Sequence, residues 1–187
     1  MEKRFKKTGS DLIRIAITGP ESTGKSLLSQ ELAAHYHTAY VPEYAREYIS
    51  HLDREYNYED LEIIAKGQIA GQIKAEKNAN GLLFCDTELT VIKIWAEHRY
   101  NKCPLWISEN LEKYPYDLYL LCNVDLPWEN DPQREHPHLR SYFFNWYLKE
   151  LQGRNVFFAI VEGNGMSRFN NALQAVDGVL HKHQLKA

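Results

Sequence analysis

The chain has 187 residues, with 22 Lys and Arg against 25 Asp and Glu, so its formal net charge is −3. This length fits one domain, and the charge balance leaves no broad basic face, which argues against nucleic acid as a partner. No stretch is long and apolar enough to cross a membrane. The three cysteines are widely spaced and form neither a disulfide framework nor a zinc motif, which favours a reducing, cytoplasmic setting.

Short apolar runs alternate with longer segments of helical periodicity along the chain. The apolar runs cover residues 12–17, 39–41, 82–85, 118–122 and 156–161, and the helical patterns include residues 61–73, 139–151 and 169–180. Continuous apolar runs of this length are typical of strands buried on both faces. Their alternation with helices predicts a parallel sheet covered by helices, whose ligands bind beyond the carboxyl ends of the strands. We expect one domain over residues 1–187, with residues 1–10 as a flexible arm.

The first apolar run leads into Gly19-Pro-Glu-Ser-Thr-Gly-Lys-Ser26, the G-x-x-x-x-G-K-S pattern of a phosphate-binding loop, or P-loop. Its glycines let the backbone approach a phosphate, and the helix that follows favours an anion at its N-terminus. Lys25 is expected to reach the β- and γ-phosphates of ATP as a catalytic group, and the Ser26 hydroxyl to help hold Mg²⁺. The plainer alternative is a glycine-rich turn that caps a helix. The loop residues expected to contact ATP are Gly19, Glu21, Ser22, Thr23, Gly24, Lys25, Ser26 and Leu27.

Two acidic residues follow the third apolar run. Asp86 stands where a Walker B carboxylate binds magnesium, directly or through water. It is also a candidate N-cap for a helix that starts near residue 87, and both roles are compatible. Glu88 is a candidate for binding a sugar hydroxyl of an acceptor, or else an acid that favours the first turn of a helix.

The second apolar run leads into Val41-Pro-Glu-Tyr-Ala-Arg-Glu-Tyr48. A carboxylate at that strand end faces the γ-phosphate from the acceptor side. Glu43 is therefore expected to orient an attacking hydroxyl or to take its proton, with Asp86 as the rival base and Arg46 as a neighbouring functional residue. Three tyrosines with four-residue spacing would form one stripe on a helix, either to stack on a ring or to pack. They are Tyr40, Tyr44 and Tyr48.

Residues 125–138 contain three prolines and many charged side chains, which prevent regular structure. A loop this long in a compact domain is usually functional or disordered, and we interpret residues 125–140 as a lid. Arg134 and Arg140 are expected to close over the transferring phosphate and stabilise its charge. Trp128 is expected to cover a base or a pyridine ring. His136 and His138 are expected to be ordinary surface residues of the loop.

The reaction class follows from what accompanies the P-loop. No Asn-Lys-x-Asp signature for guanine follows a strand, which argues against a GTPase. The arginine-bearing lid and the carboxylates at two strand ends favour a kinase for a small molecule. A glycine-containing turn at residues 162–165 follows the last strand and is weakly indicative of a nucleotide base nearby.

Together these motifs resemble the ribosylnicotinamide kinase domain of NadR-type proteins. The resemblance rests on the residues at 19–26, 41–48, 86–88 and 125–131 and extends over about residues 13–180. It implies an α/β P-loop kinase fold of three layers, with a five-stranded parallel sheet and a lid. It also implies transfer of the ATP γ-phosphate to the 5′-hydroxyl of nicotinamide riboside, which gives nicotinamide mononucleotide, a precursor of NAD.

On this chain the resemblance implies that the acceptor binds near one group of residues and that a second group closes over both substrates. The first group is Glu43, Tyr44, Arg46, Asp86 and Glu88, and the second is Trp128, Asp131 and Arg134. The family usually carries an adenylyltransferase domain, and some members a DNA-binding domain; we expect neither here, because the first strand comes soon after residue 1. Two alternatives stay open: a kinase for another nucleoside or deoxynucleoside, and an ATP-binding regulator without turnover of a small molecule. Oligomeric state is not predicted.

Overall fold

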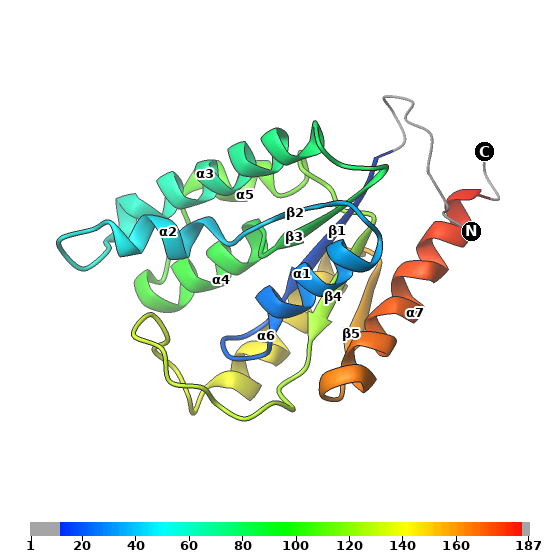
Figure 1. Cartoon of the computed structure of the whole chain (residues 1–187). Helices are drawn as coiled ribbons and strands as arrows, with labels where there is room; N and C mark the ends of the chain where they lie inside the picture. Colours follow the sequence, from blue (N-terminus) through cyan, green and yellow to red (C-terminus); the bar gives the residue numbers. More distant parts are fainter. Residues whose placement is uncertain (1–11, 185–187) are drawn as a thin grey trace.

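The computed structural model describes residues 12–184, so the arm expected at residues 1–10 lies outside the described residues. Five parallel strands form one sheet in the order β2-β3-β1-β4-β5 (Figure 1). The strands are β1 (Ile13–Thr18), β2 (Ala39–Val41), β3 (Leu82–Asp86), β4 (Leu118–Cys122) and β5 (Phe158–Val161). The predicted five-stranded parallel sheet is confirmed. The bounds of β1 and β3 differ from their apolar runs by one residue, and β5 begins two residues after the start of its run.

Helices connect the strands and cover both faces of the sheet. They are α1 (Lys25–His35), α2 (Tyr44–Ser50), α3 (Tyr58–Glu76), α4 (Leu89–Tyr100), α5 (Leu105–Asn110), α6 (Arg140–Gly153) and α7 (Gly165–Gln184). The helical patterns at 61–73 and 169–180 fall within α3 and α7, and the pattern at 139–151 begins at Leu139, the N-cap of α6. Among the described residues, none of these helices combines the length and apolar character needed to cross a membrane.

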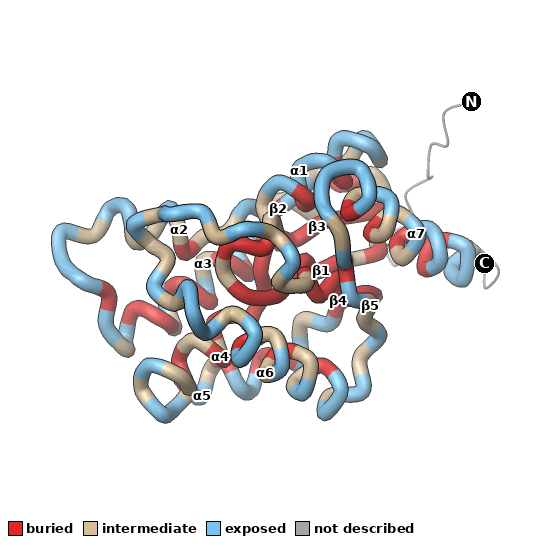
Figure 2. The backbone as a smooth tube through the Cα atoms, turned by 90° about the horizontal axis from the view of Figure 1, so that it is seen from below, coloured by how far each residue is buried: buried red, intermediate tan, exposed pale blue. Residues whose placement is uncertain are grey.

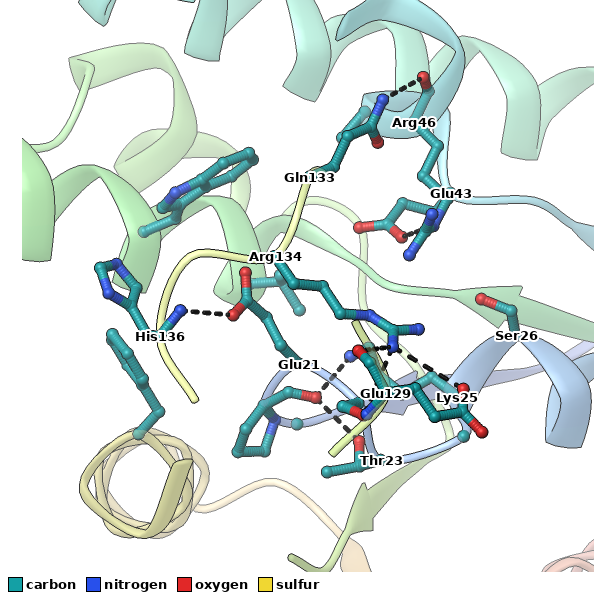
Figure 3. A pocket seen from close by; sticks show the side chains of 18 of the residues that line it. Glu21, Thr23, Lys25, Ser26, Glu43, Arg46, Glu129, Gln133, Arg134 and His136 are labelled. Atoms are coloured by element: carbon teal, nitrogen blue, oxygen red, sulfur yellow. Dashed lines mark hydrogen bonds and ion pairs between the residues drawn. The ribbon is translucent and has the colours of Figure 1, made fainter. Parts of the chain in front are cut away.

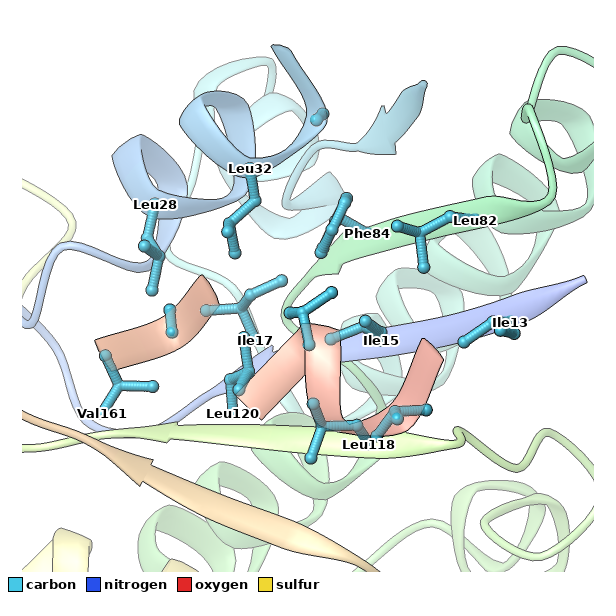
Figure 4. Packing of buried hydrophobic residues seen from close by; sticks show 14 of the residues in the cluster. Ile13, Ile15, Ile17, Leu28, Leu32, Leu82, Phe84, Leu118, Leu120 and Val161 are labelled. Carbon is cyan, nitrogen blue, oxygen red and sulfur yellow. The ribbon is translucent and has the colours of Figure 1, made fainter. Parts of the chain in front are cut away.

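The two faces of the sheet bury different sets of side chains because successive residues of a strand point to opposite sides. Ile13, Ile15 and Ile17 of β1 pack against α1 and α7, together with Leu28 and Leu32 (Figure 4). Ala16 faces the other side, where β3 and β4 pack against α4 and α6. A third cluster joins α2, α3, α4 and α5 outside that face. The three central strands β1, β3 and β4 are therefore largely buried, whereas the edge strands β2 and β5 are partly exposed; Figure 2 shows most of the exposed surface on the helices and loops.

The strand register brings the predicted functional segments to one edge of the sheet. Ile17 lies beside Asp86 in the β1–β3 pair, and Val41 lies beside Cys85 in the β2–β3 pair. The P-loop follows β1, Glu43 stands two residues after the end of β2, and Asp86 ends β3. Three adjacent strands thus deliver these groups to the same carboxyl edge, where ligands of open parallel sheets bind.

The tyrosine stripe expected on a helix is only partly present. Tyr40 belongs to β2 and is 37% exposed, so it does not share a helix with the other two tyrosines. Tyr44 and Tyr48 lie one turn apart on α2, with ring centroids 6.1 Å apart. The strand extends to Val41 and the helix begins at residue 44, which separates Tyr40 from its expected partners.

Candidate active site

The P-loop turns sharply between β1 and α1, and its glycines are required there. Gly19 has φ of 127°, and a Cβ at this position would lie 2.9 Å from the carbonyl oxygen of Cys122. Gly24 has φ of 73° and is the N-cap of α1. Side chains do not readily adopt these conformations, so the loop depends on glycine for its shape. The hydroxyl of Thr23 and the ammonium of Lys25 both donate to the carbonyl of Pro20, at 2.8 and 2.7 Å.

Arg168 of α7 bonds to the backbone of the P-loop, a role that was not predicted from the sequence. Its side chain is 6% exposed and forms an ion pair of 2.6 Å with Asp125. The guanidinium also donates to the carbonyl of Thr23 at 2.7 Å and to that of Gly163 at 3.0 Å. The backbone N–H of Gly163 donates to Asp125 in turn, at 2.6 Å. Arg168 therefore joins the P-loop to the segments that follow β4 and β5, although no local motif marks it.

Asp86 is the buried acid of the site. It is 2% exposed, and its Oδ1 atom has no hydrogen-bond partner among the described residues. Burial raises the pKa of its carboxyl to about 6, and the nearby charge of Glu43 adds to the rise, while the Ser26 hydroxyl and Lys25 oppose it. An unpartnered buried carboxylate oxygen that faces a P-loop serine fits a Mg²⁺ ligand.

The described residues contain no group of three or more His, Cys, Asp or Glu side chains that would hold a metal ion alone. A magnesium ion at Ser26 and Asp86 would therefore depend on phosphate oxygens and water for its other ligands, as is usual for Mg²⁺ in phosphoryl-transfer sites.

Glu88 does not line the cavity, contrary to its expected role at the acceptor. It is 1% exposed and is the N-cap of α4, where its carboxylate accepts from the Thr90 N–H at 2.7 Å and from the Thr18 hydroxyl at 3.2 Å. The helix begins at Leu89, two residues later than expected. Glu88 is thus the capping residue that Asp86 was proposed to be, which leaves Asp86 free for another partner.

Glu43 occupies the N-cap position of α2, yet its side chain makes no capping hydrogen bond. Instead its carboxylate lines the cavity and lies 3.3 Å from the guanidinium of Arg46. Arg46 also pairs with Asp131 of the lid at 2.8 Å. Arg46 therefore links the acidic end of β2 to the lid, while Glu43 keeps an oxygen toward the cavity (Figure 3).

The lid lies against the P-loop through a set of polar contacts. Glu21 accepts hydrogen bonds from the backbone N–H groups of Glu135 and His136, at 3.2 and 3.1 Å. Arg134 donates to the carbonyl of Glu129 at 2.6 Å and to the Ser22 hydroxyl at 3.4 Å. Figure 3 shows the Arg134 side chain extending toward the P-loop. The predicted lid and P-loop are therefore in direct contact.

Not every predicted lid residue reaches the cavity. Arg134 lines it, whereas Trp128, Asp131 and Arg140 lie outside the lining. Arg140 instead donates to the carbonyls of Ser22 and Leu126, at 3.2 and 2.9 Å, and its guanidinium lies 5.8 Å from the centre of the Trp128 ring. Arg140 therefore supports the loop backbone, and the Trp128 indole N–H donates to the side chain of Asn130 at 3.0 Å.

The prediction that His136 is an ordinary surface residue of the loop is wrong, because this side chain lines the cavity. Its ring packs edge-on against His98, with centroids 4.8 Å apart, and near Phe143. His138 is exposed as expected. A clue in the sequence is that His136 shortly precedes α6, whose first turn carries Phe143, one of its ring contacts.

These groups enclose a cavity of about 370 Å³ with two different ends. The polar end consists of the P-loop, Glu43, Arg46 and the lid residues Glu129, Gln133 and Arg134. The apolar end is formed by Ile49, Val91, Ile94, Trp95, Phe143 and Tyr147. Tyr44 contributes no lining, because its ring packs on α3. Such a cavity suits a ligand with a charged or hydroxylated part and a flat ring.

A P-loop at the carboxyl edge of a parallel sheet, with a buried acid ending the neighbouring strand, defines a P-loop protein of the nucleotide-binding class. The chain belongs to the AAA domain family, whose model matches residues 14–168.

Relatives and solved structures agree with this class. The chain is 30% identical over 169 residues to the trifunctional NAD biosynthesis/regulator protein NadR of Escherichia coli (strain K12), a match that covers 87% of this chain and 41% of the relative. It therefore spans about two fifths of the length of that relative. The crystal structure of a NadR protein in complex with NR superposes with a TM-score of 0.74 at 22% identity, over 90% of this chain and 52% of the other. The structure of deoxyadenosine kinase from M. mycoides superposes with a TM-score of 0.62 at 14% identity, over 89% of this chain and 100% of the other.

Proposed function

We propose that this protein is an ATP-dependent nucleoside kinase that phosphorylates the 5′-hydroxyl of nicotinamide riboside. The observation that carries this proposal is that one cavity joins a P-loop to a carboxylate on its acceptor side and to an apolar, aromatic end. The likeness to NadR, and the solved complex of a NadR protein with NR, support this acceptor over other small molecules.

The polar end suits the phosphates of ATP. The P-loop amides and Lys25 bind the β- and γ-phosphates, and the carbonyl contact of Lys25 with Pro20 is exchanged for phosphate when the nucleotide binds. Ser26 and Asp86 are the residues that would hold Mg²⁺, and the ion would neutralise charge on the phosphates. Arg134 already points at the P-loop from the lid, where its positive charge stabilises the charge of the transferring group.

Glu43 is the residue best suited to the acceptor hydroxyl. Its carboxylate borders the cavity, is not engaged in capping α2, and within residues 12–184 pairs with one cationic group, the Arg46 guanidinium. Glu43 orients the 5′-hydroxyl and accepts its proton as the oxygen attacks the γ-phosphate in line. Asp86 is buried next to Ser26, so we assign it to the metal instead of the proton.

The apolar end suits the ring of the nucleoside. Trp95, Phe143 and Tyr147 offer three aromatic surfaces, and a pyridinium ring carries a positive charge that aromatic faces attract. Aromatic contacts tolerate other rings, so a kinase for another nucleoside or deoxynucleoside is the second candidate. The match in fold to deoxyadenosine kinase favours the same candidate.

The test is ADP release from magnesium-ATP with and without nicotinamide riboside, beside adenosine, uridine, cytidine and thymidine. We expect release to be stimulated mainly by nicotinamide riboside. Stimulation by another nucleoside would keep the kinase and discard this acceptor. ATP binding without stimulation by any acceptor would point to a regulator that senses the nucleotide.

A further inference from the structure

We propose that Gln68 is a positioning residue that sets the separation of Glu43 and Asp86 by joining the start of α2 to the end of β3. The inference rests on the proposed kinase function, in which Glu43 acts on the acceptor hydroxyl and Asp86 holds the metal ion at the phosphates. Gln68 lies on α3, is 2% exposed, and does not line the cavity. It therefore acts through the two acids and not on a substrate.

The amide oxygen of Gln68 supports the residue next to Glu43. It accepts a hydrogen bond of 2.8 Å from the backbone N–H of Tyr44, the first residue of α2. The first N–H groups of a helix have no partner within the helix, and side-chain caps usually supply one. The N-cap residue here is Glu43, whose side chain makes no such bond. Gln68 thus supplies a cap from another helix, and the Glu43 carboxylate stays available to the cavity.

The amide nitrogen of Gln68 supports the residue that carries the other acid. It donates to the backbone carbonyls of Asp86 and Thr87, at 3.2 and 3.4 Å. Only one orientation of the amide satisfies all three partners, because the Tyr44 N–H needs an acceptor and the two carbonyls need a donor.

The end of β3 requires this support because its backbone is strained. Thr87 has φ of 67°, a conformation that a β-branched residue rarely adopts. Strain of this kind persists only where the surroundings fix it, and it tends to occur at functional sites. A further backbone contact there is the N–H of Thr87, which donates to the carbonyl of Ile17 at 3.0 Å. Gln68 and β1 together hold the turn that points Asp86 toward Ser26.

Gly67, the residue before Gln68, is a second point of contact between α3 and Tyr44. A Cβ at Gly67 would lie 2.1 Å from the Tyr44 ring, so only glycine lets α2 approach α3 this closely. Gly67 and Gln68 therefore form one docking point, at which Tyr44 is held by its ring and by its N–H. Because Glu43 directly precedes Tyr44, this contact fixes the carboxylate relative to the strand that ends in Asp86.

Gln72 offers a matched control on the same helix. It lies one turn further along α3, is also 2% exposed, and accepts from the Tyr116 hydroxyl at 2.7 Å. Its amide nitrogen donates to Glu76 at 3.4 Å. Replacing either glutamine by methionine removes a buried amide of similar size. Gln72 reaches β3 through the Cys85 thiol, which donates to its amide oxygen at 4.0 Å, whereas Gln68 bonds to the backbone of Tyr44, Asp86 and Thr87.

The experiment compares the wild type, Gln68→Met and Gln72→Met in the ADP-release assay with the best acceptor, together with melting temperature and hydrogen exchange of the Tyr44 amide. We expect Gln68→Met to lower kcat about tenfold or more and to change the KM for ATP by less than about threefold, because a small misplacement of reacting groups is costly. Gln72→Met should lower the melting temperature as much and keep kcat within about twofold. Protection of the Tyr44 amide should be lost in Gln68→Met alone.

A second variant keeps the proposal testable if Gln68→Met folds poorly. Gly67→Ala leaves the Gln68 amide in place and displaces Tyr44 by the new methyl group, so it should also lower kcat more than it raises the KM for ATP. Equal kcat values for the wild type and Gln68→Met, or equal losses in both glutamine variants, would overturn the role of Gln68 while the kinase stands. Absence of turnover with every acceptor in the wild type would overturn the proposed function and this inference with it.

Discussion

The carboxylate of Glu21 in the P-loop accepts a hydrogen bond of 3.1 Å from the backbone N–H of His136 in the lid. The N–H of Glu135 donates to the same carboxylate. The loop that binds phosphate and the loop that closes the cavity are therefore tied together by an acid within the P-loop itself. Arrival of a phosphate would place a second negative charge near Glu21, so we expect nucleotide binding to change the position of the lid.

The first prediction tests this coupling through proteolysis of the lid. Glu21→Ala should make the nucleotide-free protein more sensitive to trypsin after Arg134, because the lid loses its charged acceptor. A hydrogen bond to a charged group contributes on the order of 1.5 kcal/mol, which corresponds to a rise of about tenfold in the population of the open lid and in the cleavage rate. The measurement is the rate of appearance of the fragment that ends at Arg134. Glu31→Ala on the exposed side of α1 is the control, and equal cleavage of both variants would contradict the coupling.

The second prediction concerns the lysine of the P-loop. Lys25→Ala should lower turnover by at least about a hundredfold, since the loss of one charged group aimed at the transition state costs on the order of 3 kcal/mol. Lys74→Ala, on the exposed face of α3, is the control for removal of a positive charge. Steady-state ADP release measures both. Turnover of Lys25→Ala within tenfold of the wild type would remove Lys25 from the catalytic assignment.

The third prediction separates chemistry from binding at Glu43. Glu43→Gln keeps the size and polarity of the side chain and removes its negative charge and basicity. We expect kcat to fall by about a hundredfold, within the range found for general bases, while the Kd for ATP stays within about twofold. Glu47→Gln, one turn away on the exposed side of α2, should have no such effect. An increase in the acceptor KM alone would make Glu43 a binding residue.

The fourth prediction follows from the raised pKa of Asp86. The pKa of about 6 lies above the ordinary value of 3.8, so the metal-free folded state holds this proton more tightly than the unfolded state does. As pH rises from about 4 to about 6, the metal-free protein should lose on the order of 2 to 3 kcal/mol of stability. Asp86→Asn should abolish this part of the pH dependence and be the more stable protein at pH 7 in EDTA.

Magnesium should reverse the effect, because a cation at Asp86 stabilises the charged carboxylate. Stabilisation of the wild type by Mg²⁺ and ATP should decrease as pH falls through about 6, since the proton then competes with the ion. Melting temperatures with EDTA and with Mg²⁺-ATP, at several pH values, measure both effects. Asp53→Asn, an exposed acid, serves as the control. A pH profile of Asp86→Asn identical to that of the wild type would contradict the assignment.

Functional residues that belong to short sequence motifs were predictable. Residues whose partners are distant in the sequence were not. The P-loop and the acids at the ends of β2 and β3 follow from short motifs after apolar runs, and the structure brings Lys25, Glu43 and Asp86 to one edge. Two roles stayed open for Glu88, because one acid two residues after a strand end can serve a ligand or stand at the start of a helix. The helix start at Leu89 decides between these roles, and helix starts are the least certain feature of a sequence.

Gln68 and Arg168 illustrate the other case. Gln68 contacts residues 18 to 24 positions away, and Arg168 contacts Thr23 from 145 positions away. Neither side chain lies in a motif, and a glutamine or an arginine in a helix is ordinarily a solvated residue. Their burial, below 10% exposure in both cases, becomes visible only when α3 and α7 are packed on the sheet.

The fifth prediction uses this burial to test Arg168. Arg168→Met should lower the free energy of unfolding by about 3 kcal/mol, because it leaves Asp125 without its partner in a largely buried pair. It should also weaken ATP binding by about tenfold. The hydrogen bond from the Arg168 guanidinium to the Thr23 carbonyl holds the P-loop in its binding conformation, and its loss costs on the order of 1.5 kcal/mol. Urea unfolding and equilibrium titration with a fluorescent ATP analogue measure the two effects.

Arg154→Met separates the two effects of Arg168→Met. Arg154 is the C-cap of α6, has a side chain that is 12% exposed, and bonds to Glu112, Thr90 and Tyr119, none of which belongs to the P-loop. Its replacement should cost a similar amount of stability and leave the Kd for ATP within about twofold, because no contact with the nucleotide loop is lost. If both variants weaken ATP binding equally, the effect of Arg168 reflects general loosening of the fold. If Arg168→Met alone does so, α7 sets the shape of the P-loop.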